Sequence, residues 1–359
     1  MPPAATRFQN CLSRIEPVSS ARYAEAMKHI DMLTKPKGSL GLLEDVAARL
    51  FAIQGDAKPL SVDPARIVTV AADHGVVEEG ISASPSIVTR QQVHNFLNGG
   101  AGISVFTRTN GIDHQVVDAG VAGEEFPEHP RLVQRKIASG TANMSRGPAM
   151  TMEECLAALD LGISLAESAH AMGFCCLGTG EMGIGNTTPS TALFAALYGL
   201  DPASIVGPGA GLLPEGVRRK TEVIKKSLDA NADAMKSKDH MRLLAALGGL
   251  EIATLTGLVL GSAALRLPVV IDGFISTAAC AVALAMAPQA RGYCFFSHTS
   301  AEPGHAIIMA ELGEQPLMNF GFRLGEGTGA VFGILVLRNA AAMYNDMATF
   351  SDAGVLEGT

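Results

Sequence analysis

The stretch Ile67-Val-Thr-Val-Ala-Ala72-Asp73-His74-Gly75 joins a short apolar run to two ionisable residues and a glycine. Its continuous apolar and β-branched residues are typical of a strand that is buried on both faces of a sheet. The polar residues that follow mark the place where the strand ends and a loop begins. This stretch therefore predicts a strand of a parallel sheet with functional groups at its carboxyl end.

Similar short apolar runs recur along the chain, and longer stretches with helical periodicity separate them. Strands that alternate with helices pair in parallel through right-handed crossovers. We therefore expect an α/β fold with a doubly wound parallel sheet. The further strands are expected at residues 114–118, 173–177, 269–272 and 293–297, and the helices at residues 87–106, 152–172, 188–198, 214–235, 241–265 and 278–286.

Both ends of the chain carry helical patterns. Residues 21–51 have apolar residues at helical spacing, interrupted by a turn at residues 35–39, and residues 328–350 are expected to form one long helix. We expect these segments to pack together as a small helical domain formed by the N- and C-terminal segments. The predicted division, with approximate bounds, assigns residues 60–312 to the α/β core and residues 1–59 plus 313–359 to the helical domain.

Composition excludes several classes of function. The chain has 359 residues with a net charge of −8, which argues against nucleic acid as its main partner. The apolar residues 250–270 contain Glu251 and Arg266, so they predict a buried helix followed by a strand and no membrane span. The N-terminus has no apolar stretch of a signal peptide, and the six cysteines lack CxxC spacing. We expect a cytoplasmic protein with free thiols.

Small or ionisable residues follow every predicted strand. In a parallel sheet such residues meet at one edge, so they are expected around one crevice. Individually, a strand-end aspartate can serve only as a cap, and a histidine can be structural. A metal site made of Asp73, His74 and His298 lacks the usual ligand spacing, so no metal and no cofactor are predicted. The strand-end groups are Asp73-His74-Gly75, Asp118-Ala-Gly120, Gly178-Thr-Gly-Glu181, Asp272-Gly273 and Ser297-His298.

Three glycine-rich segments are candidates for ligand binding. The stretch Gly178-Thr-Gly180-Glu-Met-Gly183 matches the dinucleotide-binding pattern, but Glu181 in the expected turn would face a pyrophosphate. The loop Gly207-Pro-Gly-Ala-Gly211 precedes a basic helix and is read as a phosphate cradle or as a flexible turn with a solvated basic face. In Gly325-Glu326-Gly327 a carboxylate stands between glycines; its alternative role is to complement the dipole of the following helix.

Together the motifs resemble those of the nicotinate-nucleotide–dimethylbenzimidazole phosphoribosyltransferases, in order and spacing and over nearly the whole chain. These motifs are Lys35-Pro-Lys-Gly-Ser-Leu-Gly41, Ala72-Asp-His-Gly-Val76 with Glu79-Gly80 and Ser84-Pro85, Gly180-Glu-Met-Gly-Ile-Gly-Asn-Thr-Thr188, Leu247-Gly-Gly249, Asp272-Gly-Phe274, Ser297-His298 with Ser300-Ala-Glu302, and Arg323-Leu-Gly-Glu-Gly327. One departure is the loop at residues 207–211, where many relatives carry Arg and Thr in place of Pro208 and Ala210.

The resemblance implies a homodimer with a Rossmann-like core that transfers phosphoribose from nicotinate mononucleotide to 5,6-dimethylbenzimidazole in cobalamin biosynthesis. It implies Glu326 as the catalytic general base and Glu181 as a residue that lines the nucleotide site. The other substrate-binding residues that it implies are Lys220 and Ser300 at the phosphate and ribose, Asp272 nearby, Ser84 and Gln92 near the benzimidazole, and Gly183 and Arg323 within the matching motifs.

Other functions stay open at this point. The acceptor can be adenine, a phenol or another benzimidazole. A dinucleotide-dependent oxidoreductase is disfavoured by Glu181 within the glycine pattern, and a non-catalytic nucleotide-binding relative is disfavoured by the intact Glu326.

Overall fold

Six parallel strands form one sheet in the order β3-β2-β1-β4-β5-β6. The computed structural model describes residues 6–55 and 59–356. The strand order changes direction between β1 and β4, as it does in doubly wound sheets. The prediction of a Rossmann-like, doubly wound α/β fold is therefore confirmed. The strands are β1 Ala65–Ala72, β2 Asp113–Gly120, β3 Leu132–Gln134, β4 Cys176–Met182, β5 Val269–Ile271 and β6 Cys294–Phe296.

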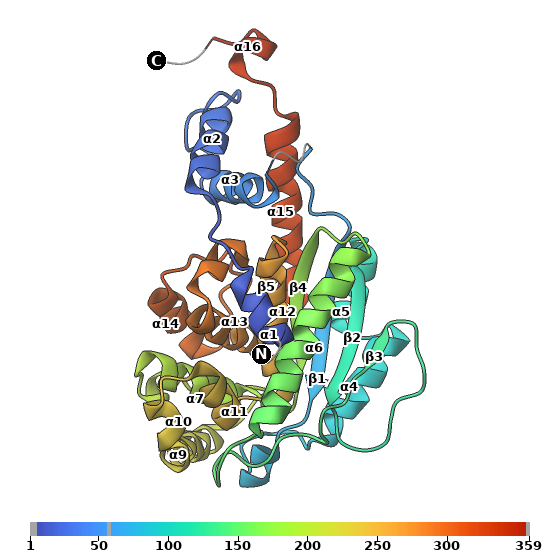
Figure 1. Cartoon of the computed structure of the whole chain (residues 1–359), viewed down its shortest axis with the longest axis vertical. Coiled ribbons are helices and arrows are strands. Elements are labelled where there is room, and N and C mark those ends of the chain that lie inside the picture. Colours follow the sequence, from blue (N-terminus) through green and yellow to red (C-terminus); the bar gives the residue numbers. More distant parts are fainter. Residues whose placement is uncertain (1–5, 56–58, 357–359) are drawn as a thin grey trace, which may run out of the picture.

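All eight residues of the central strand β1 are buried. Both faces of the sheet are therefore covered, as in other parallel sheets. Figure 1 shows α6 (Met152–Ala171) in front of β1 and β2. Helix α6 begins with the capping box of Thr151 and Glu154 and packs along α12 (Leu250–Ala264). A Cβ atom at Gly162 would lie 1.9 Å from the Thr254 carbonyl oxygen, so the two helix backbones touch where this glycine lies.

Helix α15 (Thr328–Asp346) connects the sheet to the helices at the end of the molecule. Its contacts include β1, β4, β5 and β6 at one end and α3 (Leu42–Gln54) at the other. Helices α4 (Ile87–Asn98) and α5 (Gly102–Thr109) also pack against the strands. Because α15 begins at the sheet, the residues just before it reach the carboxyl ends of the strands.

The N- and C-terminal segments join each other beyond the sheet. The Thr34 N–H donates to the Ala348 carbonyl at 3.0 Å, and the Phe350 N–H donates to the Met32 carbonyl at 3.0 Å. Figure 1 shows α2 (Ser20–Asp31), α3 and α16 (Phe350–Ala353) grouped around the far end of α15. Helix α1 (Arg7–Ser13) packs instead on α6 and α12. The domain bounds given above stay a prediction.

Three predicted helices are each divided in two, so these predictions are wrong in their bounds. Residues 87–106 form α4 and α5 because Gly99 takes a left-handed conformation with φ 81° and ends α4. Residues 241–265 form α11 (His240–Leu247) and α12, which Gly248 and Gly249 separate. Residues 214–235 form α9 (Pro214–Ala230) and α10 (Ala232–Lys236). The last long helix ends at Asp346, four residues before the predicted end at Phe350.

The position of the third predicted strand is also wrong. The sequence predicts it at residues 173–177, but β4 runs over Cys176–Met182 and includes the glycine pattern except for its last residue, Gly183. Glu181 therefore lies in a strand and not in a turn. The short edge strand β3 was not predicted.

Six further helical elements occur in the described residues. No helix in residues 6–55 and 59–356 is long and apolar enough to span a membrane. These elements are η1 Gly75–Glu79, α7 Thr187–Tyr198, α8 Pro202–Ile205, α13 Phe274–Met286, η2 Pro288–Tyr293 and α14 Pro303–Leu312.

Candidate active site

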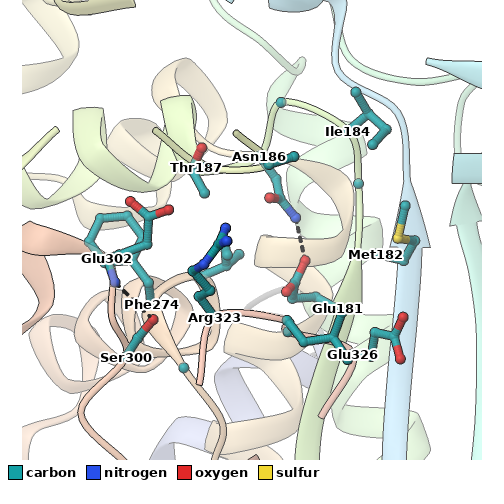
Figure 2. Close-up of a pocket in the computed structure, with 18 of the residues that line it drawn as sticks. Glu181, Met182, Ile184, Asn186, Thr187, Phe274, Ser300, Glu302, Arg323 and Glu326 are labelled. Carbon is teal, nitrogen blue, oxygen red and sulfur yellow. Dashed lines mark hydrogen bonds between the residues drawn. The ribbon is translucent and has the colours of Figure 1, made fainter. Parts of the chain in front are cut away.

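A cavity of about 330 Å³ lies at the carboxyl ends of β4, β5 and β6, next to the strand-order switch (Figure 2). A pocket of this size accommodates a small molecule, and the switch point is where doubly wound sheets bind their ligands. Seven of the nine predicted site residues line the cavity; Lys220 lies just behind its wall and Ser84 lies nearby on the loop before α4. The seven are Gln92, Glu181, Gly183, Asp272, Ser300, Arg323 and Glu326.

The loop that carries Glu326 has an unusual backbone. Gly325, Glu326 and Gly327 all have positive φ, at 79°, 65° and 101°. A non-glycine residue with positive φ costs about 1 kcal/mol or more and persists only where the surroundings hold it. Here the Thr69 hydroxyl donates to the Glu326 carbonyl at 2.8 Å, and a Cβ atom at Gly180 would lie 2.3 Å from that oxygen. The loop is therefore fixed against strands β1 and β4.

The Glu326 carboxylate faces the side of the cavity formed by α4 and α5. Its Oε1 accepts a hydrogen bond from Gln92 Nε2 at 2.6 Å, and its Oε2 accepts one from the Ile103 N–H at 3.2 Å. Burial raises the pKa of Glu326 above its ordinary value, although these two hydrogen bonds oppose the rise. A carboxylate with a raised pKa is suited to accept a proton near neutral pH.

Within the described residues the Glu326 carboxylate accepts no hydrogen bond from the first turn of α15; its backbone donor is Ile103, in the first turn of α5. Asp272 binds the start of α15 instead: its Oδ1 accepts from the Ala330 N–H at 3.0 Å and its Oδ2 from the Gly327 N–H at 3.2 Å. Burial raises the pKa of Asp272 to about 7, against the opposing effect of these backbone donors. Asp272 therefore anchors the first turn of α15, and with it the loop that presents Glu326.

Glu181, the second-last residue of β4, lies at the floor of the cavity. Its Oε2 accepts a hydrogen bond from Asn186 Nδ2 (Figure 2). Burial raises the pKa of Glu181 to about 8; Asn186 opposes this rise, and the nearby carboxylates Glu251, Asp272 and Glu326 add to it. Without a ligand Glu181 is therefore mainly protonated at neutral pH, and a bound cation would favour its ionised form.

The opposite end of the cavity holds the cationic side chains of Lys220 and Arg323 together with the Glu302 carboxylate. Lys220 is fully buried, and its Nζ donates to Thr187 Oγ1 at 2.6 Å and to the Gly207 carbonyl at 3.1 Å. A Cβ atom at Gly209 would lie 3.6 Å from Nζ, so only the glycine loop separates the ammonium from the cavity. Burial lowers the pKa of Lys220 to about 8, and Glu302 opposes the shift. Figure 2 shows Arg323 reaching into the cavity between Glu302 and Asn186.

Sequence reasoning did not assign a role to several residues that line this cavity. Glu302 Oε2 is buried without a hydrogen-bond partner in the described part of the chain. The signal for these residues was their place within the family motifs, because periodicity does not show that they face a ligand. They are Asn186, Thr187, Phe274 and Glu302.

The two histidines that the sequence singled out have different surroundings. His74 Nε2 lies 2.6 Å from Glu251 Oε1, and both side chains are buried below Gly183. Burial lowers the pKa of His74, but the charge and hydrogen bond of Glu251 and the charge of Asp73 together make the net shift upward. His74 is thus engaged in a buried pair, whereas His298 lines the cavity.

Within the described ranges, His, Cys, Asp and Glu side chains form no cluster of three that can hold a metal ion.

The hydrogen bond from Thr69 to the Glu326 loop gives a testable prediction. Thr69→Val keeps the shape of the side chain but removes the donor that fixes the Glu326 carbonyl, and it also removes the 3.0 Å contact of the hydroxyl with His114 Nε2. A net hydrogen bond contributes about 1 kcal/mol, so we expect kcat to fall about fivefold. Steady-state kinetics test this, with Thr254→Val in α12 as a control for the loss of a buried hydroxyl. Equal kcat for Thr69→Val and the control would show that the bond does not position Glu326.

Known proteins resemble this chain over nearly its full length. A family model described as "Phosphoribosyltransferase" matches residues 15–355. The nicotinate-nucleotide–dimethylbenzimidazole phosphoribosyltransferase of Nitratidesulfovibrio vulgaris strain DP4 is 58% identical over 350 residues, which cover 98% of each chain. The enzyme of that name from Chlorobaculum tepidum is 46% identical, over 97% of this chain and 98% of its own. The crystal structure of the Thermus thermophilus enzyme superposes with a TM-score of 0.89 at 44% identity, covering 95% of this chain and 100% of that chain.

The fold and these similarities define a phosphoribosyltransferase built on a doubly wound sheet, and the cavity at the carboxyl edge of that sheet is its candidate active site. Buried carboxylates at one end of the cavity and a lysine at the other suit a substrate that has a reactive base and a phosphate. The chain belongs to the family of nicotinate-nucleotide–dimethylbenzimidazole phosphoribosyltransferases, and the predicted resemblance is confirmed.

Proposed function

We propose that this enzyme transfers phosphoribose from nicotinate mononucleotide to 5,6-dimethylbenzimidazole, giving α-ribazole 5′-phosphate and nicotinate for cobalamin biosynthesis. The observation that carries the proposal is the buried Glu326 carboxylate, which Gln92 and the start of α5 hold at the cavity wall. The names of the relatives at 58% identity support the choice of substrates.

The reaction needs one proton acceptor. A lone pair of one benzimidazole nitrogen attacks C1′ of the ribose, and the bond between C1′ and the nicotinate nitrogen breaks. The bonding electrons return to the pyridine ring, which leaves without its positive charge. The other azole nitrogen loses its proton to Glu326, because a bound azole would otherwise keep a positive charge. General-base help of this kind typically contributes about 10²–10⁴-fold.

Glu181 supports the same reaction from the floor of the cavity. The nucleotide brings a pyridinium cation, and the developing charge at C1′ is also positive. Either charge lowers the pKa of a neighbouring carboxyl, so the bound nucleotide would convert Glu181 to its ionised form. The carboxylate would then stabilise the oxocarbenium-like transition state electrostatically. Gly183, two residues further, leaves room for the ligand at the end of β4.

We assign the end of the cavity at Lys220 and Arg323 to the 5′-phosphate. Lys220 uses two of its three ammonium hydrogens on Thr187 and Gly207, and the third is available for a phosphate oxygen. Arg323 and Ser300 lie on the same side of the cavity and would contact the phosphate and ribose. Asp272 would act mainly by holding the loop, while Gln92, with Ser84 nearby, would contact the benzimidazole.

The identity of the acceptor base is tested by product analysis. The protein is incubated with nicotinate mononucleotide and, separately, dimethylbenzimidazole, benzimidazole, adenine and a phenol, and the product masses are measured. We expect the fastest turnover with dimethylbenzimidazole. Transfer only to adenine or the phenol would identify a different acceptor, and no transfer to any base would reject the proposed reaction. The oxidoreductase alternative loses its main support because Gly178 and Gly180 of the glycine pattern lie within β4 and not in a turn that follows a strand.

Activity should persist after exhaustive treatment with EDTA. The donor carries a monophosphate, and its leaving group departs as a neutral pyridine, so no pyrophosphate needs a divalent ion to neutralise it. Initial rates before and after chelation measure this directly. Loss of activity with EDTA and its return with Mg²⁺ or Zn²⁺ would contradict the mechanism.

The assembly and cellular location are proposals of the same kind. We propose a homodimer, supported by an aromatic cluster near the cavity in which Phe320 is 60% exposed and packs against Phe322 and Phe332. Light scattering in solution measures the mass, and a monomer would contradict the proposal.

A cytoplasmic location is supported by the six free cysteines and is testable by cell fractionation.

A further inference from the structure

His298 forms part of the cavity wall directly after β6. Only 3% of the residue is exposed, and its ring packs edge-on against Phe322 at 5.7 Å between centroids and against His305 at 6.5 Å. A Cβ atom at Gly329 would lie 2.1 Å from His298 Nδ1, so the start of α15 approaches the ring closely. These contacts hold the imidazole in one orientation.

Neighbouring hydrogen bonds determine which nitrogen of His298 carries the proton. The Ser297 hydroxyl donates to the Asp272 carbonyl oxygen at 2.7 Å, because a carbonyl can only accept. Its single hydrogen is used there, so the contact of 3.0 Å between Ser297 Oγ and His298 Nδ1 requires an N–H at Nδ1. Burial lowers the pKa of His298 to about 4, which keeps the ring neutral at physiological pH. The lone pair of the neutral imidazole is therefore at Nε2.

This Nε2 atom has no hydrogen-bond partner within the described residues, although His298 lines the cavity. Gly273 also lines the cavity, and a Cβ atom there would lie 3.5 Å from Nε2. The missing side chain thus leaves the nitrogen reachable. His305 differs, because its Nδ1 accepts from the Ser300 N–H at 2.7 Å and its Nε2 contacts Thr277 Oγ1 at 3.0 Å. Both nitrogens of His305 are used within the protein, and one nitrogen of His298 is not.

An unpaired acceptor in a cavity calls for a hydrogen-bond donor on the ligand. The phosphate and the carboxylate of nicotinate mononucleotide are acceptors, and the pyridinium nitrogen carries no hydrogen. The azole N–H of the acceptor base is directed to Glu326 in the mechanism above. The ribose hydroxyls are the O–H donors that remain. We infer that His298 Nε2 accepts a hydrogen bond from a ribose hydroxyl of the nucleotide, an inference that rests on the proposed function.

Such a bond would contribute to the reaction as well as to binding. A hydroxyl close to C1′ becomes a stronger donor as the sugar gains oxocarbenium character, so a bond to it strengthens in the transition state. His298 would thereby set the orientation of the ribose and select ribonucleotides over their deoxy analogues. A neutral acceptor serves this purpose without adding another charge beside Glu181 and Asp272.

The test combines substitutions of His298 with nucleotides that lack one ribose hydroxyl. We would measure kcat/KM with nicotinate mononucleotide and with its 2′-deoxy and 3′-deoxy analogues, for the wild-type protein, His298→Phe and His298→Gln. Phenylalanine keeps the ring that packs on Phe322 and His305 but has no acceptor, whereas the glutamine oxygen can replace Nε2. We expect His298→Phe to lose at least about tenfold with the natural nucleotide, and His298→Gln to recover part of that loss.

In the wild-type enzyme, one of the two deoxy analogues should have a kcat/KM that is lower than that of the natural nucleotide by a similar factor. In His298→Phe, the kcat/KM for the same analogue should be no lower than that for the natural nucleotide. If both analogues suffer the same penalty in the wild type and in His298→Phe, the inference is overturned. Absence of turnover of nicotinate mononucleotide by the wild-type enzyme would instead overturn the proposed function, so that assay comes first.

A measurement on the unmodified protein covers the case in which a variant fails to fold. In ¹⁵N spectra of histidine-labelled wild-type protein, His298 should show a protonated Nδ1 and an unprotonated Nε2. Saturating nicotinate mononucleotide should shift the Nε2 resonance in the direction of a hydrogen-bonded acceptor. A proton on Nε2 in the free protein, or an Nε2 resonance that the nucleotide leaves unchanged, would contradict the inference.

Discussion

Glu326→Gln should lower kcat by at least about 10²-fold, the low end for the loss of a general base. Glutamine keeps the size of the side chain and an oxygen that can accept from Gln92 or Ile103, but it cannot take the azole proton. The KM for nicotinate mononucleotide should change little, because the carboxylate lies at the end of the cavity assigned to the acceptor base. The rate is best measured in a single turnover, so that product release does not hide the chemical step.

The matched control is Glu311→Gln, which removes the same charge from an exposed position on α14. Its kcat should equal that of the wild type. Circular dichroism and the oligomeric state should be unchanged in both variants. A near-normal single-turnover rate for Glu326→Gln would remove Glu326 from the role of base, and an equal loss of nucleotide affinity would indicate a structural role.

Lys220→Met should raise the KM for nicotinate mononucleotide about 10-fold to 100-fold and lower kcat much less. Methionine fills the buried channel of the lysine side chain but cannot donate to the phosphate. A hydrogen bond from a charged group contributes about 1.5–3 kcal/mol, which corresponds to this range. Arg218→Ala is the control, because it removes one positive charge from the same helix outside the buried channel. If the two variants had the same KM, Lys220 would not contact the phosphate.

The pH dependence of the wild-type enzyme offers a second check on Lys220. Burial lowers the pKa of this lysine to about 8, so the free enzyme carries the ammonium below that pH and loses it above. Phosphate binding favours the charged form. Glu181 also titrates in this range but is present in both proteins, so the ratio of the Lys220→Met KM to the wild-type KM isolates Lys220. This ratio should stay constant below pH 8 and fall above it.

The general position of the site followed from the sequence. Polar residues after apolar runs predicted that Asp272 and His298 would meet at one edge of a parallel sheet, and both line the cavity. Glu326 was conspicuous because a carboxylate between two glycines suits neither a solvated helix face nor a core. These predictions depend on local patterns and on the geometry of parallel sheets, which constrain the structure strongly.

The contacts within the site did not follow from the sequence. Glu326 stands directly before α15 in the sequence, but its carboxylate accepts a hydrogen bond from Ile103 in the first turn of α5. The first turn of α15 is bound instead by Asp272, which is distant in the sequence. Strand β4 passes through Gly178 and Gly180, which have low strand propensity but leave room for α15 and the Glu326 loop. Tertiary contacts of this kind overrule local preferences and are visible only in the structure.

The central claim is that Glu326 removes the azole proton, and a series of benzimidazoles with increasingly electron-withdrawing substituents tests it most directly. An acceptor with a more acidic N–H depends less on a base, so single-turnover rates of wild-type enzyme and Glu326→Gln are compared for each acceptor at saturation. The account predicts that the ratio of the variant rate to the wild-type rate increases as the N–H becomes more acidic. A ratio that is constant across the series would contradict proton removal by Glu326.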